Sequence, residues 1–347
     1  MSDLLEYSGL ATKIKAMKAK LLTDEDFACL MEQGSVGGIL SYLKKSDSYK
    51  IILANENESS IRRHRLEELV RSTLYNDFDK IYKFSHAVQK AYLKAFFMKY
   101  EIAVIRKALR RCYGKIQNDY QIGVIELPAF ERRSSINLKQ IMTASNVEEV
   151  ISALDGTGYD NVLKMIWQRG NAGLFDYESV LDIYYFKSLW KAGHKVLPKS
   201  DLEIIRKNYG QEIDLLNIQW LYRAKKYYKL SPAQMYSLVI PIYYKIRKQD
   251  MLYLVKTESG EEFTETVNKL PYIRKAGGIE NVNLEKMYDE QMKKLFQDGI
   301  RKNPYSIACI ESYFYQKEKE IDRLIRVIEC VRYEVKRDDM VHYILGA

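Results

Sequence analysis

The stretch YGQEIDLLNIQWLYRAKKYYKL, Tyr209–Leu230, decides the fold of this chain. It contains no proline, and its apolar residues Ile213, Leu216, Trp220 and Leu221 recur at helical spacing. Its acidic residues come early and its basic residues come late. The stretch therefore predicts one long helix. It leaves open whether this helix belongs to an active site, a nucleic-acid surface or a structural strut.

Similar stretches occur at two other places in the chain. KYEIAVIRKAL contains Glu101, GQEIDLLNIQW contains Glu212, and EKEIDRLIRVI contains Glu320, each followed by apolar residues at matching positions. The first two glutamates lie 111 positions apart, and the last two lie 108 positions apart. This recurrence indicates an internal repeat of roughly 110 residues, which is too long for tetratricopeptide, HEAT or ankyrin units.

A second set of segments has the same period. SVGGILSYLKKSDSY aligns with NVEEVISALDGTGY, and QDMLYLVKTESGEEF gives a weaker third copy with Leu252 and Val255 at the equivalent positions. Two independent matches that share one sequence offset are not expected from chance similarity between amphipathic helices. The matched apolar pairs of the first two copies are Val36 and Val147, Ile39 and Val150, Leu40 and Ile151, and Leu43 and Leu154.

The repeat predicts an all-α fold of three similar helical domains, with bounds 1–125, 126–230 and 231–347. The seams are expected in IELPAFERRSS, Ile125–Ser135, and just before Ser231. Three such units could string out as an arch or close around a pseudo-threefold axis, and the periodicity does not choose between these arrangements.

The signals for helix starts support this fold class. No glycine or proline occurs from residue 39 to residue 113, and Asn-Gly or Asp-Gly hairpin turns between alternating segments are absent. Three capping boxes are expected to begin helices: SNVE from Ser145, SDLE from Ser200 and SPAQ from Ser231. In the last of these, Pro232 stands at the first helical position, where its missing N–H is no loss.

Composition permits many partners but demands none. The chain has 347 residues, 47% of them apolar, and a net charge of +9 from 55 basic and 46 acidic residues. Its 28 tyrosines suit protein interfaces and base stacking equally. The four cysteines form no C-x-x-C pair and no leader sequence is recognised, so a reducing, cytoplasmic setting is expected. The longest apolar run, Met235–Tyr244, is too short for a membrane span.

Catalytic and metal-binding patterns are missing from the sequence. No phosphate-binding P-loop occurs, because GSVGG, Gly34–Gly38, lacks the lysine and is predicted to be a bend between helices. Asp338 and Asp339 stand next to each other, and no further acidic residue follows at the spacing that a magnesium-binding aspartate motif needs. No second histidine stands within a helical turn of another. We therefore predict no catalytic, cofactor-binding or metal-binding residue, including any of the histidines, His64, His86, His194 and His342.

The repeated glutamates admit two interpretations. Glu101, Glu212 and Glu320 could form a symmetric ring of carboxylates, but a catalyst needs an asymmetric set of groups. We expect them near helix starts, where a carboxylate offsets the positive end of the helix dipole by about 0.3–1 kcal/mol.

Four basic clusters raise the question of a polyanionic partner. Each is local, and the simplest interpretation is a solvated helix face or compensation of a helix C-terminus. Binding to nucleic acid or to an anionic membrane surface is the alternative. The clusters are KIKAMKAK (Lys13–Lys20), RRHR (Arg62–Arg65), RKALRR (Arg106–Arg111) and RAKKYYK (Arg223–Lys229).

Four stretches together resemble the C subunit of archaeal and bacterial V-type rotary ATPases, which is called the d subunit in eukaryotes. They are YSGLATKIKAMKAKLLTDEDFACLM from Tyr7, DIYYFKSLW from Asp182, EIDLLNIQWLYRAKKYY from Glu212, and YFYQKEKEIDRLIRVIECVRY from Tyr313. Each is degenerate alone, but they occur in the right order over essentially the whole chain. Within the repeat, Asn217 has no counterpart, since Arg106 and Ile325 stand at the equivalent positions.

This resemblance implies a fold and a function. The fold is an all-helical funnel of three domains around a pseudo-threefold axis. The function is that of a non-catalytic, cofactor-free socket on the cytoplasmic face of the membrane. The partners are the central-axle subunits and the proteolipid rotor ring of an H⁺- or Na⁺-transporting complex, without nucleic acid. Which residues face either partner stays unknown at this stage. The alternatives are a basic helical scaffold that binds nucleic acid and an all-α enzyme with an unrecognised site.

Overall fold

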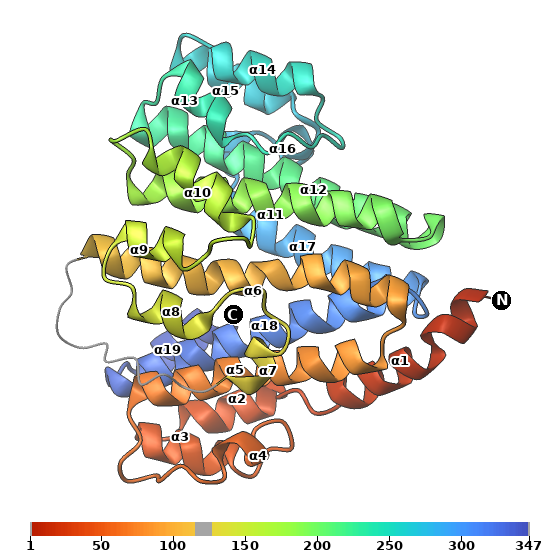
Figure 1. The fold of residues 1–347 in the computed structure, drawn as a ribbon, viewed down its shortest axis with the longest axis vertical. Coiled ribbons are helices and arrows are strands. Elements are labelled where there is room, and N and C mark those ends of the chain that lie inside the picture. Colours follow the sequence, from red (N-terminus) through yellow and green to blue (C-terminus); the bar gives the residue numbers. More distant parts are fainter. Residues whose placement is uncertain (1, 115–126, 346–347) are drawn as a thin grey trace. The chain divides into compact units, whose positions relative to one another are not determined.

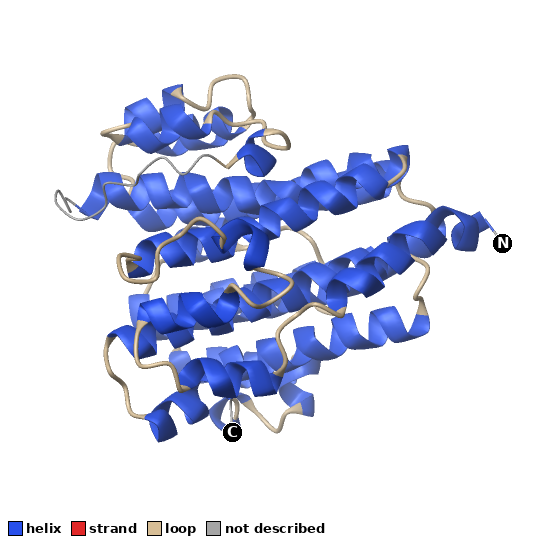
Figure 2. Ribbon diagram, turned by 90° about the horizontal axis from the view of Figure 1, so that it is seen from below, coloured by secondary structure: helices blue, strands red, loops and turns tan. Residues whose placement is uncertain are grey.

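The computed structural model describes residues 2–114 and 127–345. Within these ranges every regular element is a helix, which confirms the predicted all-α class (Figures 1 and 2). None of the helices in these ranges is long and apolar enough to cross a membrane.

Contacts divide the chain into two compact units. Unit 1 contains Met1–His86, Ile125–Arg133 and Lys302–Ala347, and unit 2 contains Ala87–Val124 and Ser134–Arg301. The beginning and the end of the chain therefore share one unit. This division follows contacts rather than sequence repeats, and the three domains with bounds 1–125, 126–230 and 231–347 stay a prediction.

Unit 1 is organised around its longest helix, α18. α18 has buried residues on nearly every turn, and α1, α2, α3, α5 and α19 all pack against it. Phe78 of α5 meets Phe314 of α18 with 5.6 Å between ring centroids. The helices of unit 1 are α1 (Ser2–Lys18), α2 (Asp24–Met31), α3 (Val36–Leu43), α4 (Lys50–Leu53), α5 (Arg63–Phe84), α7 (Pro128–Glu131), α18 (Ile307–Arg332) and α19 (Arg337–Leu345).

Unit 2 is organised around three long helices, in which α11 packs against both α6 and α12. Short helices pack beside these long ones. The elements of unit 2 are α6 (Ala87–Gly114), α8 (Leu138–Thr143), α9 (Val147–Ser152), α10 (Tyr159–Trp167), α11 (Leu174–Val196), α12 (Lys199–Arg223), η1 (Ala224–Tyr228), α13 (Pro232–Leu238), α14 (Lys248–Lys256), α15 (Gly260–Lys269), α16 (Pro271–Lys275), η2 (Ile279–Asn281) and α17 (Leu284–Lys302, which unit 2 contains up to Arg301).

The stretch Tyr209–Leu230 is helical, as predicted, to the end of α12 and on through one π-helical turn, η1. The helix ends where Lys229 adopts a left-handed conformation with φ 48°. Ile213 and Leu221 are buried as core residues. Trp220 is only half-buried, although it shares their helical spacing.

Of the three predicted capping boxes, one is confirmed, one is displaced by one residue and one is wrong. Ser231 and Gln234 form the predicted box at α13. At α9 the cap is Asn146 rather than Ser145, and the Glu149 carboxylate accepts the Ser145 N–H, so the box is displaced by one residue. At α12 the prediction was wrong, because the helix already begins at Lys199, directly after Pro198. Pro198 itself occupies the N-cap position, so the helix starts one residue before the expected cap.

The structure corrects the position of one repeat copy. α3, α9 and α15 are capped by Ser35, Asn146 and Ser259, and each cap side chain accepts the N–H three residues on. The third copy of this helix is therefore α15 and not the segment with Leu252 and Val255, which lies in α14. Buried apolar residues follow each cap at the fourth and eighth positions: Ile39 and Leu43, Val150 and Leu154, Phe263 and Val267.

The segment GSVGG begins with the predicted bend between helices, at Gly34 and Ser35 between α2 and α3, and then continues into α3. Ser35 caps α3, so Gly37 and Gly38 lie in its first turn. A Cβ at Gly37 would stand 2.2 Å from the carbonyl oxygen of Glu58. The predicted bend is therefore confined to Gly34 and Ser35, and the missing side chain at Gly37 serves close packing within α3.

Gly210 of α12 makes a similar close approach possible. A Cβ at this position would lie 2.7 Å from Cγ and 2.8 Å from Cβ of Tyr244. We expect Gly210→Ala to destabilise the protein by about 1–3 kcal/mol, because the ring and its backbone must shift. The measurement is urea unfolding. Gly9→Ala in α1 is the matched control, because that Cβ meets nothing within 4 Å and alanine favours helix. Equal stabilities of the two variants would contradict this packing.

Candidate functional site: three carboxylate clamps

The histidines and the aspartate pair considered for catalysis are spread over several helices, and Asp338, Asp339 and His342 share α19. His64 is in α5, His86 is exposed after it, and His194 bonds the Trp190 carbonyl oxygen at 2.8 Å within α11. Asp338 and Asp339 are exposed in the first turn of α19. His342 lies in the same helix. Among residues 2–114 and 127–345, no group of three His, Cys, Asp or Glu side chains could hold a metal ion.

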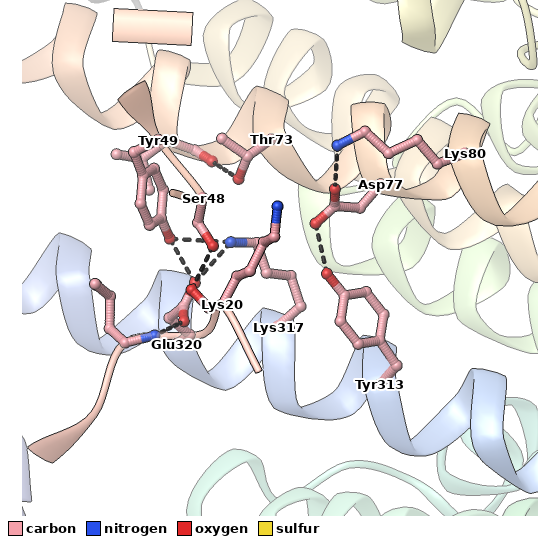
Figure 3. A network of polar contacts seen from close by, with 11 residues as sticks. Lys20, Ser48, Tyr49, Thr73, Asp77, Lys80, Tyr313, Lys317 and Glu320 are labelled. Atoms are coloured by element: carbon pink, nitrogen blue, oxygen red, sulfur yellow. Dashed lines mark hydrogen bonds and ion pairs between the residues drawn. The ribbon is translucent and has the colours of Figure 1, made fainter. Parts of the chain in front are cut away.

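The repeated glutamate of α18 lies at the centre of a buried polar cluster in unit 1. Glu320 accepts hydrogen bonds from the Leu22 N–H at 2.5 Å and from the Tyr49 hydroxyl at 2.6 Å. The Lys317 ammonium lies 2.6 Å from the same carboxylate (Figure 3). Leu22 precedes α2 and Tyr49 precedes α4, so one carboxylate holds the starts of the first and last helices of the α2–α4 segment against α18.

Glu101 of α6 does the same in unit 2. It accepts the Ser135 N–H at 2.5 Å and the Tyr159 hydroxyl at 2.6 Å. The Ser134 hydroxyl adds a third hydrogen bond, at 2.9 Å. Ser135 precedes α8 and Tyr159 begins α10, so this carboxylate holds the α8–α10 segment against α6.

In the remaining copy the carboxylate is Asp214 of α12. It accepts the Lys245 N–H at 2.8 Å and the Tyr272 hydroxyl at 3.0 Å. The N–H groups of Tyr244 and Ile246 add longer bonds, at 3.4 and 3.3 Å. Lys245 precedes α14 and Tyr272 lies in α16. We call each of the three arrangements a carboxylate clamp, and the helical segment that it holds its module.

The structure corrects the predicted role of the repeated glutamates. Glu101 and Glu320 are buried in the middle of long helices rather than near their starts. Glu212, which the repeat aligns with them, is half-buried and accepts a hydrogen bond from Tyr288 instead. Asp214, two positions later, takes the clamp role. The signal that would have found the clamps is the recurrence of Tyr49, Tyr159 and Tyr272 at nearly the same period.

Burial keeps the clamp tyrosines protonated. It raises the pKa of Tyr49, Tyr159 and Tyr272, and the charge of the carboxylate that each one contacts raises it further. These hydroxyls therefore remain donors at any physiological pH. Burial also raises the pKa of Asp214, against the effect of its backbone N–H donors and of Tyr272.

A model of the family described as ATP synthase (C/AC39) subunit matches residues 10–343. The chain belongs to this family. The match spans both units, so all three clamps are part of the family region.

Three curated relatives are each named as the C subunit of an A-type ATP synthase. The chain is 25% identical to that of Pyrococcus abyssi, over 95% of this chain and 88% of the relative. It is 24% identical to that of Methanocaldococcus jannaschii, over 94% and 83%. It is 23% identical to that of Thermococcus kodakarensis, over 94% and 86%.

In this C/AC39-family chain, many residues of the basic clusters bind groups of the chain itself. Arg111 donates to the carbonyl oxygens of Met142 and Ala144, both at 2.5 Å. Lys225 donates to the carbonyl oxygen of Thr257 at 2.5 Å. These cations bind carbonyl oxygens at the C-terminal ends of α8 and α14, so they compensate helix C-termini as expected, although those ends belong to other helices than their own. The ion pairs formed by the other members are Arg63 with Glu67 and Glu329, Arg65 with Glu56, Arg106 with Asp182, Arg110 with Glu178, and Arg223 with Glu285.

Asn217, which has no counterpart in the other repeats, fixes the chain after α13. Its side chain is fully buried. Its amide donates to the Ile240 carbonyl oxygen at 3.0 Å and accepts the Ile240 N–H at 2.9 Å. Asn217 thus provides hydrogen-bond partners for both the N–H and the carbonyl oxygen of Ile240, at a point where the chain is not helical.

Asp79 of α5 anchors α7. Its carboxylate lies 2.8 Å from Lys83, 2.6 Å from Arg133 and 3.2 Å from Arg132. Burial alone would raise the pKa of Asp79, but hydrogen bonds from these three cations lower it to about 2. Phe130 of α7 packs on the ring of Tyr75 beside them, with 5.1 Å between centroids.

Loss of one clamp hydroxyl tests the energetic role of the clamps. We expect Tyr159→Phe to lower the free energy of unfolding by about 1–3 kcal/mol, because the buried Glu101 carboxylate loses one hydrogen-bond donor. The matched control is Tyr253→Phe, whose hydroxyl bonds Glu262 at 3.1 Å on the surface. Denaturant unfolding measures both changes. A loss for the control as large as that for Tyr159→Phe would contradict the clamp.

The Asp79 cluster predicts a dependence of stability on pH. The folded-state pKa lies below the unfolded value, so Asp79 stabilises the fold above about pH 4, and this contribution is lost as the pH falls towards 2. We expect Asp79→Asn to cost about 2 kcal/mol at pH 7, from 1.36 kcal/mol per pKa unit, and less at pH 3. Asp155→Asn, at an exposed ion pair with Lys164, is the control. A cost for Asp79→Asn that does not change with pH would exclude the linkage.

Proposed function

We propose that this chain is a non-catalytic central-stalk subunit of a V-type rotary ATPase or ATP synthase. In this role it is a socket that couples the central axle to the membrane proteolipid ring for transport of H⁺ or Na⁺. The observation that carries the proposal is the C/AC39 family match over residues 10–343, together with relatives that are named as the C subunit of A-type ATP synthases.

The clamps support a mechanical role. A part that transmits torque must resist deformation, and long helices with internally satisfied hydrogen bonds are stiff elements. Each clamp joins a short module to the middle of such a helix through buried, charge-assisted hydrogen bonds, which are stronger than neutral ones. A module held in this way can transmit force to its long helix without sliding along it.

The surface supports a role in binding proteins. Tyrosine is enriched at protein interfaces, because its ring gives apolar area and its hydroxyl stays hydrated. Among the residues that the structure describes, the tyrosines that are at least half exposed are Tyr227, Tyr228, Tyr236, Tyr253, Tyr333 and Tyr343. The partners that we propose are the axle subunits and the rotor ring, at the cytoplasmic face of the membrane and without a cofactor or nucleic acid. The internal pairing of many arginines favours this proposal over a nucleic-acid scaffold.

Omission of the chain from a reconstituted complex tests the function. We expect vesicles that carry all other subunits to retain ATP hydrolysis by the catalytic head and to lose ATP-driven ion transport. Re-addition of the purified chain, which should not hydrolyse ATP alone, restores transport. Ion transport at the full rate without the chain would overturn the proposal.

A further inference from the structure

The three clamps differ in how the chain connects each module to its receiving helix. Glu101 and Ser135 are 34 positions apart, and Asp214 and Lys245 are 31 apart. Glu320 and Leu22, by contrast, are 298 positions apart. Two modules thus follow their helix directly in the sequence, whereas the α2–α4 module reaches a helix at the opposite end of the chain. Closing the larger loop carries a greater entropic cost, which grows with the logarithm of its length.

The Glu320 clamp also contains a cation. Lys317 is completely buried, and its ammonium lies 2.6 Å from Glu320, 3.1 Å from the Tyr49 hydroxyl and 4.4 Å from the centre of the Tyr49 ring. The positions three residues before the other clamp carboxylates, Glu101 and Asp214, hold Met98 and Gln211.

Ion pairs on the surface of unit 1 reinforce the same contact. Arg323 of α18 lies 2.8 Å from Asp24 of α2 and covers the ring of Phe27 at 3.9 Å. Arg337 of α19 lies 2.7 Å from Glu32, just after α2. The contact of the α2–α4 module with α18 and α19 therefore depends on charges at the centre of this contact and at its edge.

We propose that Lys317, Glu320 and Tyr49 form a latch that joins the beginning of the chain to its end and opens as one unit. In the open form, residues 22–53 leave α18 while the Glu101 and Asp214 clamps stay closed. Two features support this inference: the long sequence separation at Glu320 and the buried charge pair found there. A buried pair holds strongly while both partners are present and destabilises strongly once one is removed. The proposal goes beyond the coupling function and does not depend on it.

Hydrogen exchange on the full-length chain tests the latch. In Lys317→Met, Glu320 is left as a buried charge without its cation. We expect amide exchange in residues 22–53 to accelerate by at least about a hundredfold, while that in α8–α10 and α14–α16 is unchanged. The matched control is Met98→Leu, at the equivalent position of the Glu101 clamp. Unchanged exchange in residues 22–53, or an equal increase over the whole chain, would overturn the proposal.

Two further measurements separate opening from general destabilisation. Lys317→Met combined with Glu320→Gln removes both charges, so we expect slower exchange in residues 22–53 than in the single variant. If the single variant fails to fold, exchange of the wild-type chain in low urea gives the answer. Residues 22–53 should then open with a lower free energy and a smaller urea dependence than α8–α10. The latch would be contradicted if residues 22–53 and α8–α10 opened with equal free energies and urea dependences. It would also be contradicted if residues 22–53 exchanged as fast in the double variant as in the single variant.

Discussion

A carboxylate buried in the middle of a long helix is the constraint on which this structure depends. Its own helix leaves no backbone N–H free to bind it there, and an unpaired charge inside a protein is strongly unfavourable. In each of the three copies the donors come from the N–H before a short helical module and from a tyrosine at the start of the module's last helix. The need to satisfy one charge thereby sets where each module begins and which helix it packs on.

The sequence predicted the features that depend on regular spacing. The all-α class follows from apolar periodicity and from the missing turn signals, and the internal repeat is visible in the caps and buried positions of α3, α9 and α15. The clamp at α12 was beyond prediction from the residues. An aspartate and a glutamate stand two positions apart there, and only the three-dimensional position of Tyr272 and Lys245 decides that Asp214 is the acceptor.

Charge patterns were the least informative part of the sequence. A run such as RKALRR resembles a binding surface for polyanions, yet Arg106 and Arg110 pair with acids of α11, and Arg111 binds carbonyl oxygens at the C-terminal end of α8. Those partners lie about 30 to 80 positions away, so no local pattern can reveal them. In a highly charged helical protein, a basic cluster has first to be tested against the chain's own carboxylates and helix ends.

Together, the family membership and the clamps describe a protein whose polar interior holds helices in register. We propose that this interior serves a coupling element between an axle and a ring. Cross-linking mass spectrometry on detergent-solubilised membranes that contain the intact complex tests it most directly. We expect cross-links from this chain to central-axle subunits and also to the proteolipid ring. Cross-links to neither of them, in a complex that contains both, would contradict it.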